Sequence, residues 1–278
     1  MFKFKRGSNK SVWAQRRIDY EEFLKNEKIA NKYTNRAYKR DYSFFKRAIS
    51  IHFDSMGYVY DLIHGGDEDE FYDAFMRLGV KILHNSESIR HLINLGLYGS
   101  GWTIYRTLSF DVLMLWYLYF NPNLIKEWSK EKFNTYKDVD WRKKFSEKTI
   151  IDELNRRGKK YLFNFDYETD FRLYSKAAHP SYFGVRFFQN ENGELSYLPS
   201  FSMKAGHLLL GRLIGVLPYS TQILLEKNKL EIEKNQVLGV MLEKYNKLMH
   251  ELNDYGKCLV KFNKERLGAK NARDIVGT

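Results

Sequence analysis

Proline placement is the feature that most limits what this chain can fold into. The chain has four prolines, at positions 122, 180, 199 and 218, so none precedes Pro122. A proline inside a helix removes a backbone hydrogen bond and clashes with the preceding turn, so long proline-free stretches allow long helices. All-β chains ordinarily need more turn residues than this sequence offers. An all-α fold is therefore expected.

Hydrophobic residues recur at helical spacing along most of the chain and predict a multi-helix bundle. The stretch 97–120 is apolar around most of its circumference, which is typical of a central, buried helix. Asp67 fits a helix N-cap, Gly158 fits a helix C-terminus, and Pro218 is expected to kink or split a helix. The expected helices cover about 19–33, 38–63, 68–93, 97–120, 123–136, 147–157, 166–178 and 202–228.

Residues 182–201 depart from the helical pattern. Two runs rich in aromatic and β-branched residues, YFGVRFFQ and ELSYLPSF, flank the turn-forming sequence Asn190-Glu191-Asn192-Gly193. A polar turn between two such runs is typical of a hairpin. We expect a small β-hairpin insertion here, on an otherwise helical body.

The last helix, expected over about 232–264, has the most regular apolar spacing in the chain. Its apolar residues alternate in steps of three and four, which is a heptad pattern. This seam fits two arrangements, packing inside the fold or packing against a second copy or a regulatory protein partner. Its members are Leu238, Met241, Tyr245, Leu248, Leu252, Tyr255, Leu259 and Phe262.

Domain organisation and compartment follow from charge, cysteine usage and apolar runs. Residues 1–40 are expected to form a basic N-terminal arm and first helix, and residues 41–278 a single helical domain. Cys258 is the sole cysteine, so no intrachain disulfide forms and a reducing, cytoplasmic compartment is expected. The start MFKFKRGSNKSVW lacks the apolar core of a signal peptide. Charges beside the apolar runs 91–105 and 112–125 favour buried core over membrane.

The net charge of +12 is concentrated at the start of the chain. Residues 1–40 hold 12 Lys and Arg against 4 Asp and Glu. This excess predicts a polyanion such as RNA as partner, and the alternative is a solvated basic surface. The nucleic-acid-binding candidates are Arg16, Arg17, Arg36, Lys39, Arg40 and, among the aromatics of the expected hairpin, Arg186.

Common cofactor and metal motifs are missing from the sequence, so neither a cofactor nor a metal is expected. There is no GxxxxGK[ST] loop, GxGxxG, HExxH or paired CxxC. His84, Glu87 and His91 share one helix face at a spacing that can hold a metal, but three ligands on one helix rarely converge. Surface polar residues are the simpler interpretation of these three.

Arg172 and His179 form the candidate catalytic pair. Seven residues separate them, so both lie on one helix face, with Ser175 and Lys176 between them. RNA carries its own nucleophile, the 2′-hydroxyl group, and its cleavage needs a proton-transfer group and a fixed positive charge. Histidine suits the first task and arginine the second. Because Pro180 follows, His179 is expected at a helix C-terminus, which favours the protonated imidazole.

The segment Arg172-Leu-Tyr-Ser-Lys-Ala-Ala-His179 resembles the R-x4-6-H motif of the HEPN superfamily of all-α proteins. Tyr174, Ser175, the following Pro180-Ser181 and the apolar helix ending at Asn121-Pro122 resemble a bacterial branch linked to abortive infection. The resemblance covers about residues 70–225. It implies a homodimer that cleaves RNA without metal across a shared cleft, with a role in phage defence or as a toxin.

Alternatives to catalysis remain open at each of these positions. Arg172 and His179 also fit a structural capping pair, since the bare motif occurs by chance as well, at Arg47/His52 and Arg77/His84. Arg106 and Asp111, in the apolar helix, either support the catalytic face or pair with other helices. The whole chain also fits a non-catalytic helical module that binds nucleic acid or protein, or a sensor assembled through its heptad helix.

Overall fold

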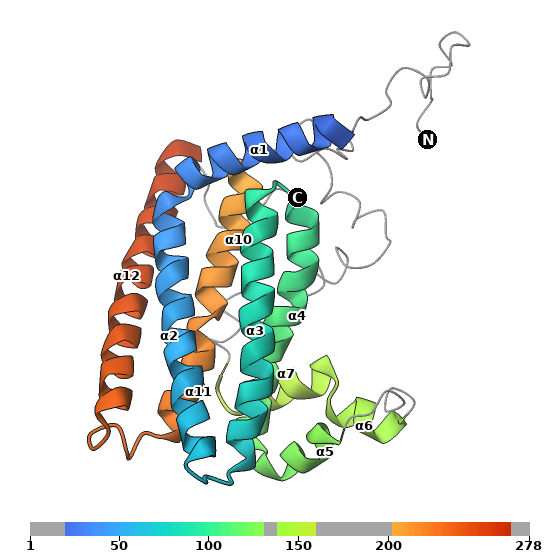
Figure 1. The fold of residues 1–278 in the computed structure, drawn as a ribbon, viewed down its shortest axis with the longest axis vertical. Coiled ribbons are helices and arrows are strands. Elements are labelled where there is room, and N and C mark those ends of the chain that lie inside the picture. Colours follow the sequence, from blue (N-terminus) through green and yellow to red (C-terminus); the bar gives the residue numbers. More distant parts are fainter. Residues whose placement is uncertain (1–19, 131–137, 160–201, 268–278) are drawn as a thin grey trace.

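The computed structural model of the chain describes residues 20–130, 138–159 and 202–267 (Figure 1). Every regular element in these ranges is a helix, which confirms the all-α class. The stretches expected to form a helix at 166–178 and a β-hairpin at 182–201 lie outside the described ranges, and so does the N-terminal arm before residue 20.

Most of the described helices match those expected from the apolar spacing, and the short helix α6 was not expected. Their bounds are α1 Tyr20–Ala37, α2 Lys39–His64, α3 Glu70–Asn94, α4 Tyr98–Phe120, the 3-10 turn η2 Pro122–Leu124, α5 Ile125–Ser129, α6 Val139–Lys144, α7 Glu147–Arg156, α10 Met203–Val216, α11 Pro218–Lys227 and α12 Gln236–Leu267.

The long helices pack side by side, and α1 lies across one end of the bundle (Figure 1). Helix α4 is central and contacts α3, α7, α10 and α11. Leu108, Leu115 and Trp116 of α4 are fully buried, as its all-round apolar sequence predicts. Helices α5, α6 and α7 lie at the end of the bundle away from α1 (Figure 1).

Helix ends follow local capping chemistry, with one correction to the sequence prediction. The N-cap of α3 is Asp69, whose side chain accepts a hydrogen bond from the amide of Phe71, and not Asp67. Asp67 instead accepts from the amide of Asp69 and so shapes the turn before the helix. Gly158 follows α7 with a φ of 70°, and Pro218 divides α10 from α11, as expected.

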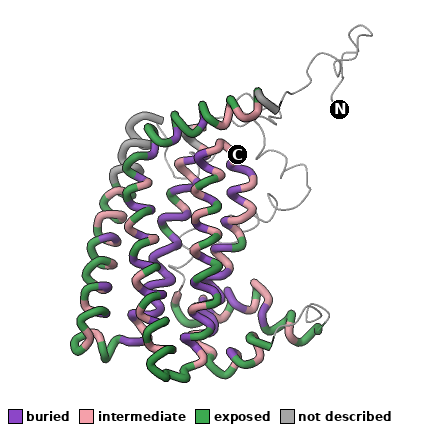
Figure 2. The backbone as a smooth tube through the Cα atoms, in the orientation of Figure 1, coloured by how far each residue is buried: buried purple, intermediate pink, exposed green. Residues whose placement is uncertain are grey.

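The heptad seam of α12 packs inside the fold. Leu238, Met241 and Leu248 are buried, and Tyr245 and Leu252 pack on the core, against α2 and α11. Figure 2 shows the buried side of α12 turned towards the bundle. Of the two arrangements open to the seam, the intramolecular one is therefore present, and this part of the seam is not available to a second copy.

One apolar stretch of the described chain, Ala205–Lys227, is long and apolar enough to cross a membrane by composition. It comprises α10 and α11, and 72% of its most apolar window is buried inside the bundle. The core helix of a folded domain passes the same composition test, and burial of this kind is typical of such a helix.

Candidate functional site

A cluster of polar side chains surrounds a buried carboxylate where α1 meets α2. We call it the Asp41 cluster, and it consists of Tyr38, the N-cap residue of α2, Arg40 and Asp41 from α2, His207 from α10 and Tyr255 from α12. Asp41 is only 3% exposed. A buried carboxylate is costly unless hydrogen-bond donors surround it, so its partners define the cluster.

Each oxygen of Asp41 is paired with a side chain from a different helix. The Nδ1 atom of His207 lies 3.3 Å from Oδ2 of Asp41, and the hydroxyl of Tyr255 donates to Oδ1 at 2.9 Å. The carboxylate therefore joins α2, α10 and α12 at one point. Holding Nδ1 of an imidazole also fixes the orientation of the ring.

The electrostatics of the cluster favour a charged imidazole. The hydrogen bond from His207 to Asp41 raises the pKa of the histidine, and partial burial of the ring opposes this shift. Burial raises the pKa of Tyr255, so its hydroxyl remains a neutral donor. The His207 side chain is 35% exposed and so reaches solvent. An oriented imidazole whose pKa is raised by a carboxylate is suited to donating hydrogen bonds to anions and to transferring protons.

Arg40 adds a fixed positive charge beside this imidazole. Its guanidinium carbon lies 4.4 Å from the centre of the Tyr255 ring, and Arg40 is exposed. Stacking on an aromatic face holds a guanidinium in place while its N–H edges stay able to bind carboxylate or phosphate oxygens. The cluster thus combines a positioned guanidinium and a positioned imidazole.

Close helix packing builds this corner of the molecule. A Cβ atom added at Gly206 would lie 2.5 Å from the hydroxyl oxygen of Tyr38, so the absence of a side chain lets α10 approach α2. The Tyr38 hydroxyl donates to the carbonyl of Ser202 at 2.8 Å, and the amide of Ser202 donates to the hydroxyl of Tyr98 at 3.1 Å. Ser202 directly follows the stretch 160–201, so the end of that stretch is attached beside the Asp41 cluster.

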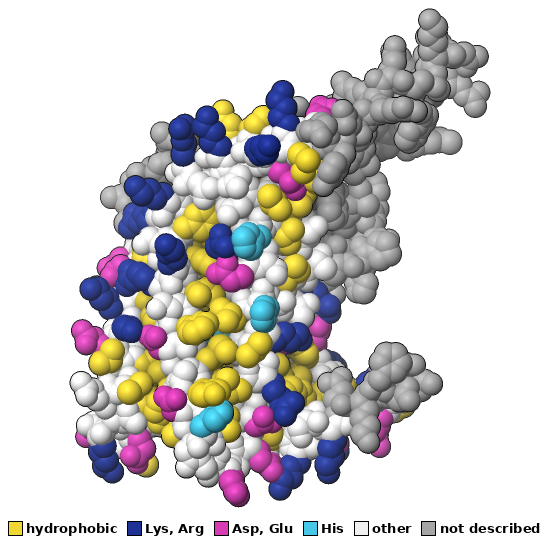
Figure 3. All heavy atoms as spheres, in the orientation of Figure 1, with side chains coloured by type: hydrophobic (Ala, Val, Ile, Leu, Met, Phe, Trp, Pro, Cys, Tyr) yellow, Lys and Arg dark blue, Asp and Glu magenta, His cyan; other side chains and the backbone are white. Residues whose placement is uncertain are grey.

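The expected catalytic pair, Arg172 and His179, lies outside the described residues. The same holds for Tyr174, Ser175 and Lys176, and for the nucleic-acid-binding candidates Arg16, Arg17 and Arg186. The other three candidates, Arg36, Lys39 and Arg40, are exposed around the junction of α1 and α2. Figure 3 shows Lys and Arg side chains gathered over this end of the bundle.

Arg106 and Asp111 pair with neighbouring helices. A guanidinium nitrogen of Arg106 lies 2.8 Å from Oε1 of Glu147 on α7, and Nζ of Lys81 on α3 lies 2.7 Å from Oδ1 of Asp111. Burial raises the pKa of Asp111, and the lysine opposes that shift. Of the two interpretations of these residues, pairing between helices is therefore present, and the two pairs do not share a partner.

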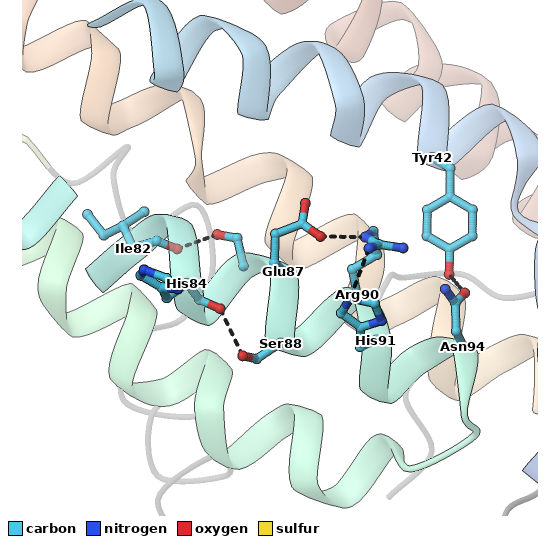
Figure 4. Close-up of polar contacts among 9 residues, drawn as sticks. Tyr42, Ile82, His84, Glu87, Ser88, Arg90, His91 and Asn94 are labelled. Carbon is cyan, nitrogen blue, oxygen red and sulfur yellow. Dashed lines mark hydrogen bonds and ion pairs between the residues drawn. The ribbon is translucent and has the colours of Figure 1, made fainter. Parts of the chain in front are cut away.

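The α3 face that carries His84, Glu87 and His91 is organised by an arginine (Figure 4). Arg90 donates to Glu87 at 2.8 Å and lies 3.1 Å from Nε2 of His91, while the carbonyl of His84 accepts from Ser88. A guanidinium within reach of two candidate ligands opposes the binding of a cation. Among the described residues, no group of three or more His, Cys, Asp or Glu side chains is arranged to hold a metal.

The two chance matches to the R-x4-6-H pattern have structural roles. Arg47 pairs with Glu251 of α12 at 2.6 Å, and Arg77 pairs with Asp73 one turn earlier. His52 is fully buried, with one ring nitrogen 2.9 Å from the carbonyl of Gly79, and burial lowers its pKa. None of these three side chains is arranged for chemistry on a substrate.

Sequence reasoning missed His207, Asp41 and Tyr255 as a group.

The chain matches no known protein family, and no characterised protein or solved structure is significantly similar to it. A functional assignment therefore depends on the residues of this chain and on their arrangement.

Proposed function

We propose that this chain is a metal-independent endoribonuclease of HEPN type, with Arg172 and His179 as its catalytic pair. In the proposed reaction the 2′-hydroxyl oxygen attacks the adjacent phosphorus and the bond to the 5′-oxygen breaks. His179 moves the protons between these two oxygens, and Arg172 stabilises the charge that develops on the phosphoryl oxygens. The products are a 2′,3′-cyclic phosphate and a 5′-hydroxyl group.

The observation that carries the proposal is where the motif-bearing stretch is attached. That stretch is followed directly by Ser202, which is hydrogen-bonded to Tyr38 at the α1–α2 junction. Exposed cations expected to bind RNA, Arg36, Lys39 and Arg40, stand on either side of Tyr38. Cations at this junction would draw the RNA backbone towards the end of the stretch that carries the motif.

The all-α body agrees with the resemblance to the HEPN superfamily. The proposal also covers the oligomeric state, the compartment and the biological role. The enzyme acts as a cytoplasmic homodimer in phage defence or as a toxin, and the aromatic residues near Arg186 in the sequence stack on bases. Since the described seam of α12 is buried, the dimer uses another surface. Phe53 and Tyr60 of α2 and Val80 of α3 are large exposed hydrophobic residues suited to that role.

Cleavage of a labelled single-stranded RNA in excess EDTA tests the proposal. We expect the wild type to cleave, and we expect His179→Ala to lower the rate on the order of a hundredfold or more. Arg172→Lys keeps the charge but loses the planar fork, so it should also be slow. His250→Ala, which removes an exposed histidine of α12, is the matched control. Cleavage by His179→Ala at the wild-type rate would reject the catalytic pair.

A non-catalytic RNA-binding module is the second candidate, favoured by the surface of α1. Tyr33 is 52% exposed between the exposed cations Lys32 and Arg36. An exposed aromatic ring among cations is suited to stacking on bases of single-stranded RNA. Tight RNA binding by a wild type that leaves saturating RNA uncut would favour this module over the nuclease.

A further inference from the structure

The Asp41 cluster contains a guanidinium and an imidazole, two groups suited to binding a phosphodiester, on neighbouring helices and outside the R-x6-H motif. Arg40 of α2 stacks on Tyr255, whose hydroxyl donates to Asp41, and Asp41 holds His207 of α10. The centres of the His207 and Tyr255 rings are 6.5 Å apart. The guanidinium and the imidazole therefore approach the same tyrosine ring.

The exposure of each side chain in the cluster indicates whether it positions its neighbours or binds a ligand. Asp41 is buried and engaged on both oxygens, so it is a positioning residue. Because Nδ1 of His207 is the atom held by Asp41, it is Nε2 that remains to donate to a ligand. Arg40 is exposed and His207 is partly exposed, so both reach solvent at this end of the bundle.

The surrounding charge favours an anion. Arg36 and Lys39 are exposed beside Arg40 on the same junction. Two acids of the helices that form the cluster are already engaged, since Asp41 of α2 holds His207 and Glu251 of α12 pairs with Arg47. Charge-assisted hydrogen bonds from guanidinium and imidazolium to phosphate oxygens are the strong kind, and Arg is well suited to making them in pairs.

We propose that Arg40 and His207 form a binding site for a phosphodiester group of single-stranded RNA, with Asp41 and Tyr255 as positioning residues. This inference rests on the proposed function for its choice of RNA as ligand. It deepens that function, because it adds a defined phosphate contact at the corner where the motif-bearing stretch is attached. The bound phosphate accepts from the Arg40 guanidinium and from Nε2–H of His207.

The test uses a fluorescent single-stranded oligonucleotide with 2′-O-methyl groups, which binds as RNA does but lacks the nucleophile for cleavage. We expect Arg40→Ala and His207→Gln each to weaken its binding on the order of tenfold, because each loses a charge-assisted hydrogen bond. Two controls remove a matched group elsewhere. Lys46→Ala removes an exposed cation from α2, and His250→Gln removes an exposed histidine from α12. Both should bind within about twofold of the wild type, as expected for surface positions away from the site.

A second measurement needs no variant at this site and so is independent of any effect on folding. In the wild type, the ring resonances of His207 should shift when the oligonucleotide is added, and those of His250 should not. The site is rejected if Arg40→Ala and His207→Gln bind like the controls, or if the His207 resonances are unchanged at saturation.

The outcome is separable from that of the nuclease proposal. The 2′-O-methyl oligonucleotide is not cut, so its binding does not depend on catalysis by Arg172 and His179. Weak binding by His207→Gln, together with unimpaired RNA cleavage by His179→Ala, would reject the catalytic pair and keep the phosphate site. The reverse pattern would keep the pair and reject the site.

Discussion

At the scale of single residues, Asp41 shows what a sequence leaves out. Its position in the first turn of α2 is ordinary for an acidic residue, because the helix dipole favours negative charge there. His207 stands in an apolar run and Tyr255 in a heptad seam, so each has a complete explanation within its own helix. Only the packing of α2, α10 and α12 brings the three together, and no spacing along the chain encodes that.

Arg106 and Asp111 are the opposite case. A charge in a helix as apolar as α4 has to be paired, so pairing could be predicted from the sequence. The partners could not, because Glu147 and Lys81 come from α7 and α3 and many other charges were equally available. The sequence therefore predicts that each of these charges is paired, but it does not predict which residue is the partner.

The Asp41–His207 pair gives the first prediction, on stability and pH. The folded-state pKa of His207 is raised by its hydrogen bond to Asp41. A raised pKa means that the pair contributes stability fully below the unfolded pKa of about 6.5, and that this contribution disappears as pH rises through the folded value. The free energy of unfolding of the wild type should therefore exceed that of His207→Gln by more at about pH 5.5 than at about pH 9.

Denaturant titrations of both proteins at the two pH values measure this difference. His250→Gln is the control, since His250 is exposed beside Asp254 and exposed pairs contribute little. If the wild type is more stable than His207→Gln by the same amount at both pH values, the pKa of His207 does not differ between the folded and unfolded states.

At the scale of elements, the periodicity of apolar residues predicted which segments are helical better than it predicted where each helix ends. The burial of α4 and the division at Pro218 followed from pattern and from proline chemistry. The helix expected over 123–136 instead begins with a 3-10 turn and continues as α5, Ile125–Ser129. The N-cap of α3 is Asp69 and not the predicted Asp67. Several acidic residues in succession can each serve as N-cap, and the geometry of the turn determines which one does.

The heptad spacing of α12 exposes a limit of a different kind. A seam in steps of three and four requires an apolar partner surface but does not say which chain provides it. In the fold, α2 and α11 provide it, and Leu238 and Leu248 are fully buried. Which surface covers the seam is decided by tertiary packing, because it depends on the apolar faces that the other helices leave uncovered.

The second prediction concerns the close approach of α10 to α2. Gly206→Ala places a methyl group against the Tyr38 ring and hydroxyl, where the nearest atom would be 2.5 Å away. Overpacking of this kind should lower the free energy of unfolding by about 1–3 kcal/mol. Gly211→Ala, in the same helix with nothing within 4 Å of the new Cβ, should leave stability unchanged or raise it by up to about 1 kcal/mol.

Thermal or denaturant unfolding of the two variants gives the comparison directly. The expectation is a clear loss for Gly206→Ala only, accompanied by weaker protection of the Ser202 amide from hydrogen exchange, because Tyr38 and Tyr98 hold Ser202. Equal stability of the two variants would mean that α10 can shift away from α2 without cost.

At the scale of the whole molecule, the structure places part of the uneven charge of the sequence at one end of the bundle. Residues 1–40 carry a net charge of +8, from 12 basic and 4 acidic residues. The described part of this segment, residues 20–40, holds six of the basic and three of the acidic residues. Most of it forms α1, which lies across the end of the bundle that holds the Asp41 cluster (Figure 1). Charge counting predicted a cationic segment, but its placement beside Ser202 depends on Ala30 and Thr34 packing into the bundle.

The third prediction separates a located RNA surface from the effect of net charge. Arg36→Ala with Lys39→Ala removes two exposed cations at the α1–α2 junction, and Lys229→Ala with Lys234→Ala removes two exposed cations from the loop between α11 and α12. Both double variants therefore have the same net charge. If the junction contacts RNA phosphates, the first should flatten the dependence of log binding constant on log salt by about 0.7 per lost contact.

Binding of the 2′-O-methyl oligonucleotide across a salt series measures both slopes. A slope lowered by about 1.4 for the junction variant, with a wild-type slope for the loop variant, is the expected result for two lost contacts. Equal changes in the two variants would mean that RNA responds to the charge of the whole molecule and not to a surface at the α1–α2 junction. The distinction matters for mechanism, because only a located surface can hold RNA in a fixed register relative to the Asp41 cluster and to Ser202, which directly follows the stretch 160–201.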